Sequence, residues 1–241
     1  MTVVAIRLAG PLQSWGSDSR FTRRTAGSEP TKSGVLGLVA AAKGLRRTDP
    51  LEELLQLRLG VRVDQPGQLM RDFHTAVRWN KDGSRKSMPL SHRYYHADAV
   101  YLAVLEGESQ LVANIHSALR SPVFPLYLGR RSCPPAGPVA LGMFEKDLDT
   151  ALGMIPWQVS PSRQRLHGQP TVRLDTARDA RPGEAAETQR DLPVSFNPHR
   201  RLYALRPVMR GSVVVENPHG VIEKPATKSS DEHDPFAALG A

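Results

Sequence analysis

Cysteine is nearly absent from this sequence. The chain of 241 residues contains one, Cys133, which excludes an internal disulfide and is typical of a protein from a reducing compartment. Protein zinc sites are commonly built from several thiolate and imidazole ligands. With a single cysteine we expect no metal site, and no motif points to another cofactor. Cys133 itself lies between Ser132 and Pro134, where buried packing is favoured over a nucleophilic role.

Long apolar runs are also missing. No segment reaches the roughly 20 residues that a helix needs to cross a bilayer. The chain starts with Met1 and Thr2 and enters an apolar run directly, without the charged region or cleavage site of a secretory signal. We therefore expect a cytoplasmic protein with no membrane partner. Aromatic residues make up only 6% of the chain, so any surface that stacks bases must depend on a few rings.

Positive charge is what the sequence has in excess. The formal net charge is +8 and the sequence pI is near 10.0. Such a balance suits a partner made of phosphates, because each Lys or Arg beside a phosphate releases a condensed counterion. An anionic membrane surface would attract the chain in the same way, so the sign of the charge alone does not choose between RNA and lipid.

The order of apolar patterns predicts an α+β fold. The expected elements are a strand at 3–8, a helix at 32–45 with Thr31 as its cap, a half-buried alternating strand at 59–63, a strand at 99–105, an amphipathic helix at 109–119 and a strand at 139–144. Asp49 and Pro50 can cap and open a short second helix. Two β-α-β units in this order predict a ferredoxin-like (RRM-like) domain, whose antiparallel sheet keeps one face free of helices for RNA.

Between the two units lies a different segment. Residues 65–97 are polar and basic, and Asn80-Lys81-Asp82-Gly83 is a turn signal between two extended stretches, which predicts an inserted β-hairpin. The chain is then divided into a domain at 1–150, a small β-rich C-terminal part at 151–216 and a tail at 217–241 that we expect to be disordered. Within the C-terminal part we expect short strands at 171–174 and 202–215, and a mobile loop at 180–191.

The start of the first helix superficially resembles a nucleotide-binding P-loop. Lys32 and Ser33 open that helix, but Ala26 and Thr31 replace the two required glycines. Pro30 also removes a backbone N–H that a phosphate cradle would need. Nucleotide hydrolysis is therefore not expected. Lys32 can still hold one RNA phosphate at the helix N-terminus, or the helix can simply cap itself.

Histidines give the only catalytic alternative. His92 and His96 stand four residues apart, and on a strand this spacing separates them by roughly 13 Å, too far to share a metal ion. Together with His74 they could act as general acid or base in RNA cleavage, because imidazole titrates near neutrality. We favour histidines that are solvated or stacked on RNA, and no Ser-His-Asp pattern is present.

Basic residues gather at three places outside the expected core. In the loop Gly129-Arg130-Arg131-Ser132, the glycine permits close approach of backbone to a ligand and both arginines can fork onto phosphates. A solvated turn is the alternative interpretation. The other clusters are Arg20, Arg23 and Arg24 in the first loop, and Arg85, Lys86 and Arg93 on the expected hairpin. Basic residues on loops or on an arm are free to meet RNA.

Four blocks of the sequence resemble one known family. They are Arg7-Leu8-Ala9-Gly10-Pro11-Leu12-Gln13-Ser14-Trp15-Gly16, then Pro30-Thr31-Lys32-Ser33-Gly34, then Arg71-Asp72-Phe73-His74-Thr75, and Tyr127-Leu128-Gly129-Arg130-Arg131-Ser132-Cys133-Pro134. In this order they resemble the group-five family of repeat-associated RNA-binding (RAMP) proteins, to which the CasD subunits of type I-E CRISPR Cascade belong. The blocks span about the first 145 residues of the chain, and the C-terminal part matches weakly.

The resemblance implies a fold and a role. The fold would be a ferredoxin-like domain with a β-hairpin thumb at about 65–97 and a small β-rich C-terminal extension. The role would be that of a non-catalytic subunit of a cytoplasmic ribonucleoprotein for antiviral defence, which holds the 5′ handle of the CRISPR RNA. Its expected partners are the Cascade large subunit, the terminal backbone subunit, whose filament it caps, and, through the complex, target DNA. A related subtype implies the alternative, a metal-independent endoribonuclease, and a protein adaptor is a third possibility.

The basic clusters and the resembling motifs together define the candidate RNA-binding residues, with no catalytic residue among them. Arg24 and Gly27 match the family's Thr-Arg-x-x-Gly pattern only in part, because Arg23 stands where that pattern has threonine. The candidates are Gln13, Trp15, Arg20, Arg23, Arg24, Lys32, Ser33, Arg71, His74, Arg85, Lys86, Arg93, Gly129, Arg130, Arg131 and Ser132.

Overall fold

The computed structural model describes residues 1–16, 23–24 and 26–221. Its centre is a seven-stranded sheet with the order β10-β1-β9-β4-β11-β13-β12, in which neighbouring strands are antiparallel. The strands are β1 (Thr2–Ala9), β4 (Arg58–Gln65), β9 (Val100–Gly107), β10 (Ala140–Phe144), β11 (Thr171–Asp179), β12 (Glu187–Ser195) and β13 (Leu202–Glu216). The fold is thus a mixed α/β fold dominated by an antiparallel sheet, as the sequence predicted.

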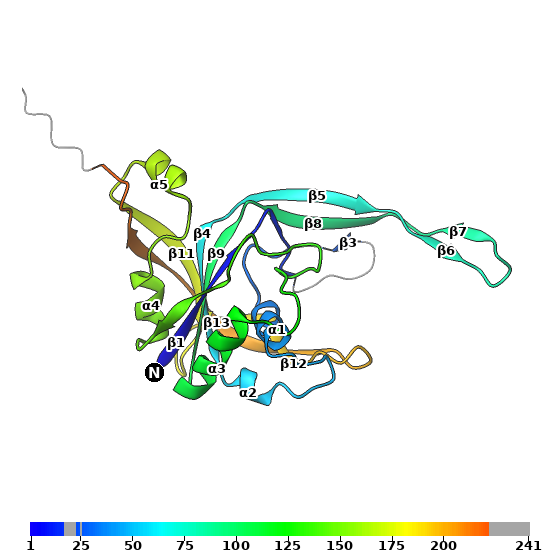
Figure 1. Ribbon diagram of the computed structural model, residues 1–241, viewed down its shortest axis with the longest axis horizontal. Helices are drawn as coiled ribbons and strands as arrows, with labels where there is room; N and C mark the ends of the chain where they lie inside the picture. Colours follow the sequence, from blue (N-terminus) through cyan, green and yellow to red (C-terminus); the bar gives the residue numbers. More distant parts are fainter. Residues whose placement is uncertain (17–22, 25, 222–241) are drawn as a thin grey trace, which may run out of the picture.

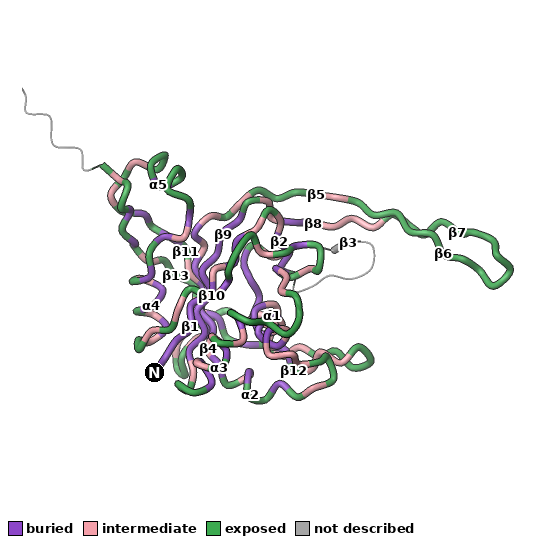
Figure 2. Tube along the Cα trace, viewed as in Figure 1, coloured by how far each residue is buried: buried purple, intermediate pink, exposed green. Residues whose placement is uncertain are grey.

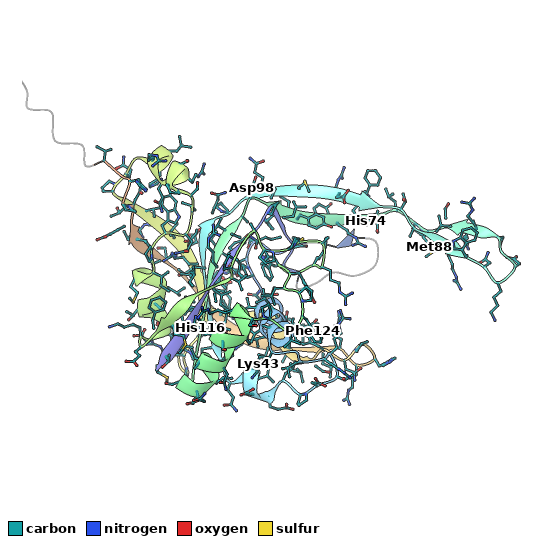
Figure 3. All side chains as sticks on the ribbon, in the orientation of Figure 1. Lys43, His74, Met88, Asp98, His116 and Phe124 are labelled. Carbon is teal, nitrogen blue, oxygen red and sulfur yellow. The ribbon has the colours of Figure 1, made fainter. Side chains whose placement is uncertain are left out.

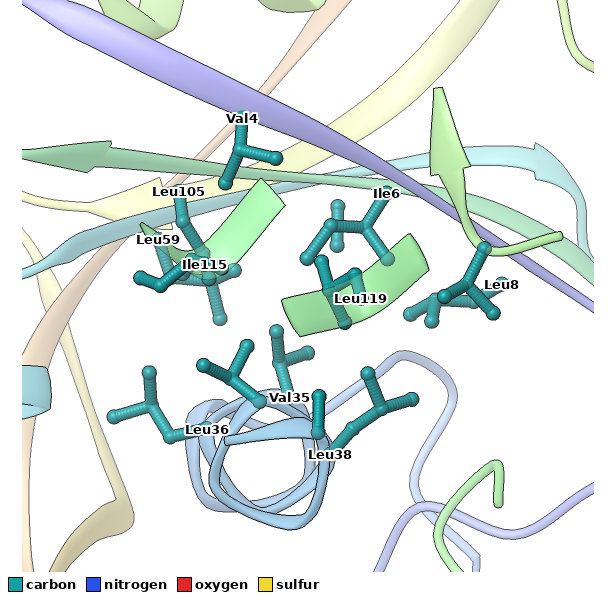
Figure 4. Close-up of a cluster of buried hydrophobic side chains, with 14 of the residues drawn as sticks. Val4, Ile6, Leu8, Val35, Leu36, Leu38, Leu59, Leu105, Ile115 and Leu119 are labelled. Carbon is teal, nitrogen blue, oxygen red and sulfur yellow. The ribbon is translucent and has the colours of Figure 1, made fainter. Parts of the chain in front are cut away.

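Two helices cover one face of the N-terminal strands. The helix α1 (Lys32–Ala42) connects β1 to β4, with the short α2 (Glu52–Leu55) before β4, and α3 (Ser109–Arg120) connects β9 to β10. Their apolar stripes meet those of the strands in the main core (Figure 4). That core includes Val4, Ile6 and Leu8 of β1, Val35, Leu36 and Leu38 of α1, Leu59 of β4, Leu105 of β9, and Ile115 and Leu119 of α3. The predicted order of strands and helices is confirmed here.

The helix starts follow local capping chemistry, with one exception. The Thr31 hydroxyl accepts a hydrogen bond from the N–H of Gly34 at 3.2 Å, so the predicted cap of α1 is confirmed. The predicted cap of the second helix is wrong. The Asp49 carboxylate instead accepts from the N–H of Arg46 at 2.7 Å, and α2 begins only at Glu52.

The prediction of a helix-free sheet face is also wrong. The helix α4 (Leu148–Met154) packs on the face opposite α1 and α3, where Leu148 and Leu152 join Val3 of β1 and Val104 of β9 in a second core. The reason lies in β1, whose consecutive apolar residues point to both faces of the sheet, so that both faces require cover. RNA therefore cannot lie on this part of the sheet.

A buried ion pair ties α4 to the sheet. Arg62 on β4 was expected on the solvent side of a half-buried strand, yet its side chain is fully buried. Its Nε donates to Asp64 Oδ1 at 2.6 Å, and its Nη1 donates to the carbonyls of Leu152 and Ile155 at 2.6 and 2.7 Å. The guanidinium satisfies carbonyls at the C-terminal end of α4 that the helix itself leaves without partners.

The C-terminal strands extend the same sheet. Strand β11 pairs with β4, where Thr176 lies opposite Arg62, and β13 then pairs with β11 and β12. The predicted loop at 180–191 is therefore wrong from residue 187 onward, because β12 pairs along the long strand β13. The tail was predicted to begin at residue 217, but Asn217 is buried, and its amide donates to the carbonyl of Gln164 in α5 (Pro161–His167). Residues 222–241 of the predicted tail lie outside the described residues.

Strands of two further sheets form an arm, defined here as residues 68–97, which extends away from the body (Figures 1 and 2). Its base pairs β5 (Gln68–His74) with β8 (Ser91–Ala97), and its outer part pairs β6 (Val77–Trp79) with β7 (Arg85–Ser87). At the tip Gly83 has a φ of +79°, as a tight turn requires. On its other edge β8 pairs with β2 (Leu12–Gln13) and β3 (Arg23–Arg24). Within the described part of the chain, no helix is long and apolar enough to span a membrane.

Candidate nucleic-acid interface

The loop at residues 129–132, called the arginine loop below, is held by a closed backbone turn. The N–H of Leu128 donates to the carbonyl of Cys133 at 2.7 Å, and the N–H of Cys133 donates to the carbonyl of Arg130 at 2.9 Å. Both Leu128 and Cys133 are buried. The loop is therefore anchored in the core at both ends and presents only its middle to solvent.

Gly129 brings this loop against the segment after β2. It has a φ of +83°, and a Cβ added there would lie 2.0 Å from the carbonyl oxygen of Ser14. The N–H of Ser14 in turn donates to the carbonyl of Leu128 at 3.1 Å. Only glycine permits both the left-handed conformation and this approach of two backbone segments.

The two arginines of the loop lie differently. The Arg130 guanidinium carbon is 4.9 Å from the centre of the Tyr95 ring on β8, a cation–π contact that joins the loop to the base of the arm. Arg131 and Ser132 are exposed. One arginine is thus fixed in orientation, and its neighbour is free to follow a ligand.

Beside the loop lies an open groove of about 980 Å³, called the arginine groove below. One side of it is formed by small residues of α1, namely Gly34, Gly37, Ala40 and Ala41. The arginines that line it are Arg46, Arg47, Arg130, Arg131, Arg190 and Arg201, and the described lining contains no Asp or Glu. The aromatic residues with exposed surface that line it are Phe124, Tyr127, Phe196 and Tyr203, whereas Trp15, also at its lining, is fully buried. Such a surface can hold phosphates with guanidinium groups and bases with rings.

Gln13 and Trp15 were expected to contact RNA but belong to the core. The Gln13 amide donates to the carbonyls of Leu8 and Ala99 at 3.0 and 2.7 Å, and its oxygen accepts from the indole N–H of Trp15. Both side chains are fully buried. Their role is to fix the segment that Gly129 approaches, because the amide satisfies backbone groups where β1 ends and the chain turns.

Lys32 is likewise unavailable to a ligand. Its Nζ is 2.6 Å from Asp179 and donates to the carbonyl of Leu57, and the residue is 5% exposed. The backbone N–H of Lys32 donates to the Asp191 carboxylate at 2.7 Å. The N-terminus of α1 is thus already occupied by a carboxylate where a phosphate was considered. Ser33, one residue on, does line the arginine groove.

The arm carries basic and aromatic side chains together. Arg71, His74, Arg85 and Lys86 are exposed, and Arg93 is half-buried. Cross-strand register sets Arg71 opposite Tyr94 and Phe73 opposite His92, so one face of the arm combines guanidinium, phenyl and imidazole groups. Farther out, the Arg85 guanidinium lies 5.2 Å from the centre of the Trp79 ring. Figure 3 shows His74 and Met88 on the arm, well apart from Phe124 near α1.

The first basic cluster is only partly described. Arg23 and Arg24 form β3, which pairs in parallel with β8 at His92 and Arg93. Arg20 lies outside the described residues. The three segments 23–24, 91–97 and 129–132 therefore meet where the arm joins the body.

The three histidines considered for catalysis all lie on the arm. His92 and His96 lie on one strand, β8, and His74 is 3.2 Å from Asp72 on the exposed arm. Over residues 1–16, 23–24 and 26–221, no group of three or more His, Cys, Asp or Glu side chains could hold a metal ion. Burial raises the pKa of the Cys133 thiol, with a smaller opposing effect of Ser132 and Arg130, so this buried cysteine is a packing residue as predicted.

The sequence did not reveal four of the groove arginines. Arg46 and Arg47 follow α1, Arg190 lies on β12, and Arg201 directly precedes β13. Adjacent basic pairs at 46–47 and 200–201 are visible in the sequence. Only the packing of the C-terminal strands beside α1 brings them to the same groove.

These features define a class of protein: an α/β body built on an antiparallel sheet, with a projecting hairpin and a groove lined by arginines. The sequence profile of the family described as CRISPR-associated protein (Cas_Cas5) matches residues 3–209, and the chain belongs to this family. The CRISPR system Cascade subunit CasD of Escherichia coli (strain K12) is 33% identical over 156 residues, which cover 57% of this chain and 69% of that protein. The resemblance drawn from the four sequence blocks is confirmed.

Two solved structures are similar over nearly the whole chain. One, described as the crystal structure of a Cas protein, is 36% identical, with a TM-score of 0.68 over 92% of this chain and 100% of the other. The second belongs to a CRISPR RNA-guided surveillance complex and is 30% identical, with a TM-score of 0.74 over 93% of this chain and 95% of the other. The C-terminal strands are therefore included in the likeness, although their sequence signal was weak.

Proposed function

We propose that this protein is a non-catalytic, RNA-binding subunit of a cytoplasmic Cascade surveillance complex, in which it holds the 5′ handle of the CRISPR RNA and caps the backbone filament for target-DNA interference. Membership of the Cas5 family and likeness to a CasD subunit support the complex. The observation that carries the RNA contact is the arginine loop, which Gly129 presses against Ser14 and which opens onto a groove with no acidic side chain in its described lining.

Binding in this proposal needs phosphate contacts and one distorted nucleotide. Arg131 and the exposed backbone of the loop would contact handle phosphates, and Arg130 would do so from an orientation that Tyr95 holds. The arm, with Arg71, Arg85 and Lys86 exposed, would lie across the RNA and turn one nucleotide out of its stack. Arg23, Arg24, Arg93, His74 and Ser33 remain candidates at the same junction, and Arg20 stays a sequence-based candidate.

The fold assignment belongs to the same proposal. The strand order β10-β1-β9-β4, with helices α1 and α3 on one face, supports a ferredoxin-like domain at about 1–150 in which the arm serves as a thumb. The strands at 151–216 would then be its C-terminal extension.

The arm would contact neighbouring subunits as well as RNA. Its exposed apolar side chains are Leu69, Met70, Phe73, Val77, Trp79, Met88 and Leu90. A two-stranded hairpin with so much exposed apolar surface is marginal alone in water, so a protein surface in the complex would stabilise it. The large subunit and the terminal backbone subunit are the proposed partners. A body without the arm that still assembles normally would argue against this role.

The experiment for the RNA contact is a salt titration of binding. Replacing both loop arginines, Arg130→Ala with Arg131→Ala, should weaken binding of handle-bearing RNA and lower the slope of log Kd against log salt by about 1.4, since each single-strand phosphate contact contributes about 0.7. The matched control is Arg163→Ala with Arg165→Ala, which removes the same charge from exposed positions on α5. Equal affinity and slope in the loop variant and the wild type would refute the assignment of this loop.

One observation keeps a second function open. The contact between His74 and Asp72, at 3.2 Å, is a geometry in which a carboxylate can orient a general base. A metal-independent endoribonuclease would cleave repeat RNA in the presence of EDTA, and His74→Ala would abolish that cleavage. Intact RNA after prolonged incubation with the purified wild-type protein would exclude this function.

A further inference from the structure

The arginines of the C-terminal strands divide into two groups. Of those that do not line the arginine groove, three are in ion pairs: Arg178 with Asp149 and Glu184, Arg206 with Asp179 and Asp191, and Arg210 with Glu29 and Glu187. The fourth, Arg173, donates to the Ser212 hydroxyl at 3.1 Å. Arg190 and Arg201, which line the groove, have no ion pair among the residues that the structure describes. Among the described residues, the Arg190 guanidinium makes a single long hydrogen bond, from Nε to the carbonyl of Tyr203 at 3.4 Å.

The same contrast holds at the end of α1. Arg46 and Arg47 are exposed and line the groove, and their guanidinium groups have no ion pair within the described chain, whereas Lys43 nearby is 2.5 Å from Glu53. Four unpaired guanidinium groups around one groove therefore indicate a site for an anionic ligand.

Aromatic rings line the same groove as these charges. Phe196, at the end of β12, sits over α1 where Gly37 leaves space, since a Cβ on Gly37 would lie 3.6 Å from the ring. Phe196 and Tyr203 are half-buried and both line the groove. Guanidinium and aromatic groups that line one groove can hold the phosphates and the bases of an unpaired strand. An acidic peptide would use the charges but has no need of the rings, so single-stranded RNA is the better fit.

This wall of the groove is held firmly. Asp191, next to Arg190, accepts from Arg206 Nε and Nη2 at 2.5 and 2.9 Å and from the backbone N–H of Lys32 at 2.7 Å. It is 1% exposed. Strand β12 is thereby fixed to the N-terminus of α1, at a point where its register with β13 shifts between Arg190 and Leu192, and Arg190 lines the groove. The buried Asp191 thus supports the neighbouring Arg190 on the groove side.

We propose that the hairpin of β12 and β13, with Arg46 and Arg47, forms a second RNA-binding wall that receives the strand as it leaves the arginine loop and crosses α1. Arg190 and Arg201 contact its phosphates, and Phe196 and Tyr203 stack its bases without reading their sequence. This inference rests on the proposed function, because it takes the RNA held by the arginine loop as its ligand, and it gives the C-terminal strands a function beyond completing the sheet.

The test compares two double variants of the full-length protein. Binding of a single-stranded RNA made of the 5′ handle followed by guide nucleotides is followed by fluorescence anisotropy at several salt concentrations. Arg190→Ala with Arg201→Ala should raise Kd about tenfold at low salt and lower the salt slope by about 1.4. Combining it with Arg130→Ala and Arg131→Ala should lower the slope by about twice that amount, since the two pairs contact different phosphates. Phe196→Leu should raise Kd with no change in slope.

The outcomes separate this inference from the proposed function. If the loop variant loses affinity but the hairpin variant binds like the α5 control Arg163→Ala with Arg165→Ala, the second wall is refuted and the loop assignment stands. If only the hairpin variant loses affinity, the loop assignment fails and the second wall stands. If RNA affinity is unchanged in the hairpin variant but assembly with the other Cascade subunits is lost, the groove takes a protein and the inference is overturned. Circular dichroism of each variant establishes that it is folded.

Discussion

Gly129→Ala is the substitution that best tests how the arginine loop is built. An alanine at this position meets two obstacles. Its φ of +83° lies in the left-handed region, and its Cβ would lie 2.0 Å from the carbonyl oxygen of Ser14. Gly168, at the end of α5, has a φ of +76° with nothing within 4 Å of an added Cβ. Gly168→Ala is therefore a matched control that has the first obstacle without the second.

The magnitudes follow from these two obstacles. Alanine in a left-handed conformation costs about 1 kcal/mol, which is the whole effect expected for Gly168→Ala. Overlap with a backbone atom adds about 1 to 3 kcal/mol, as insertion of atoms into packed structure usually does. Gly129→Ala should therefore lower the free energy of unfolding by about 3 kcal/mol. For a chain of this size, each kcal/mol lowers Tm by about 2 to 4 °C.

Two assays distinguish the substitutions. Thermal unfolding should give a decrease in Tm of about 3 °C for Gly168→Ala and about 9 °C for Gly129→Ala. Relief of the clash must move the loop away from Ser14, which takes Arg130 off the Tyr95 ring, so only Gly129→Ala should weaken RNA binding at a temperature where both variants are folded. If both variants lose the same stability and both bind RNA like the wild type, the close approach of the loop to Ser14 has no role in building the site.

Three further predictions concern buried groups. Asp64→Asn should lower the free energy of unfolding by about 3 kcal/mol in urea titrations, because it leaves the charge of Arg62 buried and unpaired. Joint replacement of both residues by apolar ones should recover much of the loss. An Asp64→Asn variant as stable as the wild type would contradict this. Asp191→Asn should lower the free energy of unfolding by about the same amount, because Arg206 loses one of its two carboxylate partners. RNA affinity should fall as well. A variant that loses stability but keeps full RNA affinity would show that the groove side of β12 needs no such anchor. Cys133 should react with a disulfide reagent at pH 8 at least about tenfold more slowly in the folded protein than in urea. Burial covers the thiol and also raises its pKa, so that less thiolate is present at that pH. Equal rates in the folded and unfolded protein would refute the burial.

Local rules explain which elements the sequence predicts well. Thr31 caps α1 and the apolar stripe of α3 lies where its 3.6-residue period indicates, because capping and amphipathic patterns depend on residues a few positions apart. The turn at Asn80 and Gly83 likewise lies between paired strands β6 and β7. Local rules fail at Arg62, whose alternation pattern indicates solvent. Its burial depends on α4, a helix ninety residues farther along the chain, whose carbonyls it satisfies.

The candidate site divides in the same way. The sequence by itself determined the excess of positive charge, the family blocks and the arginine loop, since residue types and short spacings contain that information. Only the tertiary structure decided which basic residues can meet a ligand. Packing buries Lys32 against Asp179 and leaves Arg190 and Arg201 unpaired beside α1 in the described chain, because the availability of a charge depends on partners distant in the sequence. Gly129 depends on both levels. The sequence shows that the residue is glycine, and only the fold shows that the carbonyl of Ser14 lies where any side chain would overlap it.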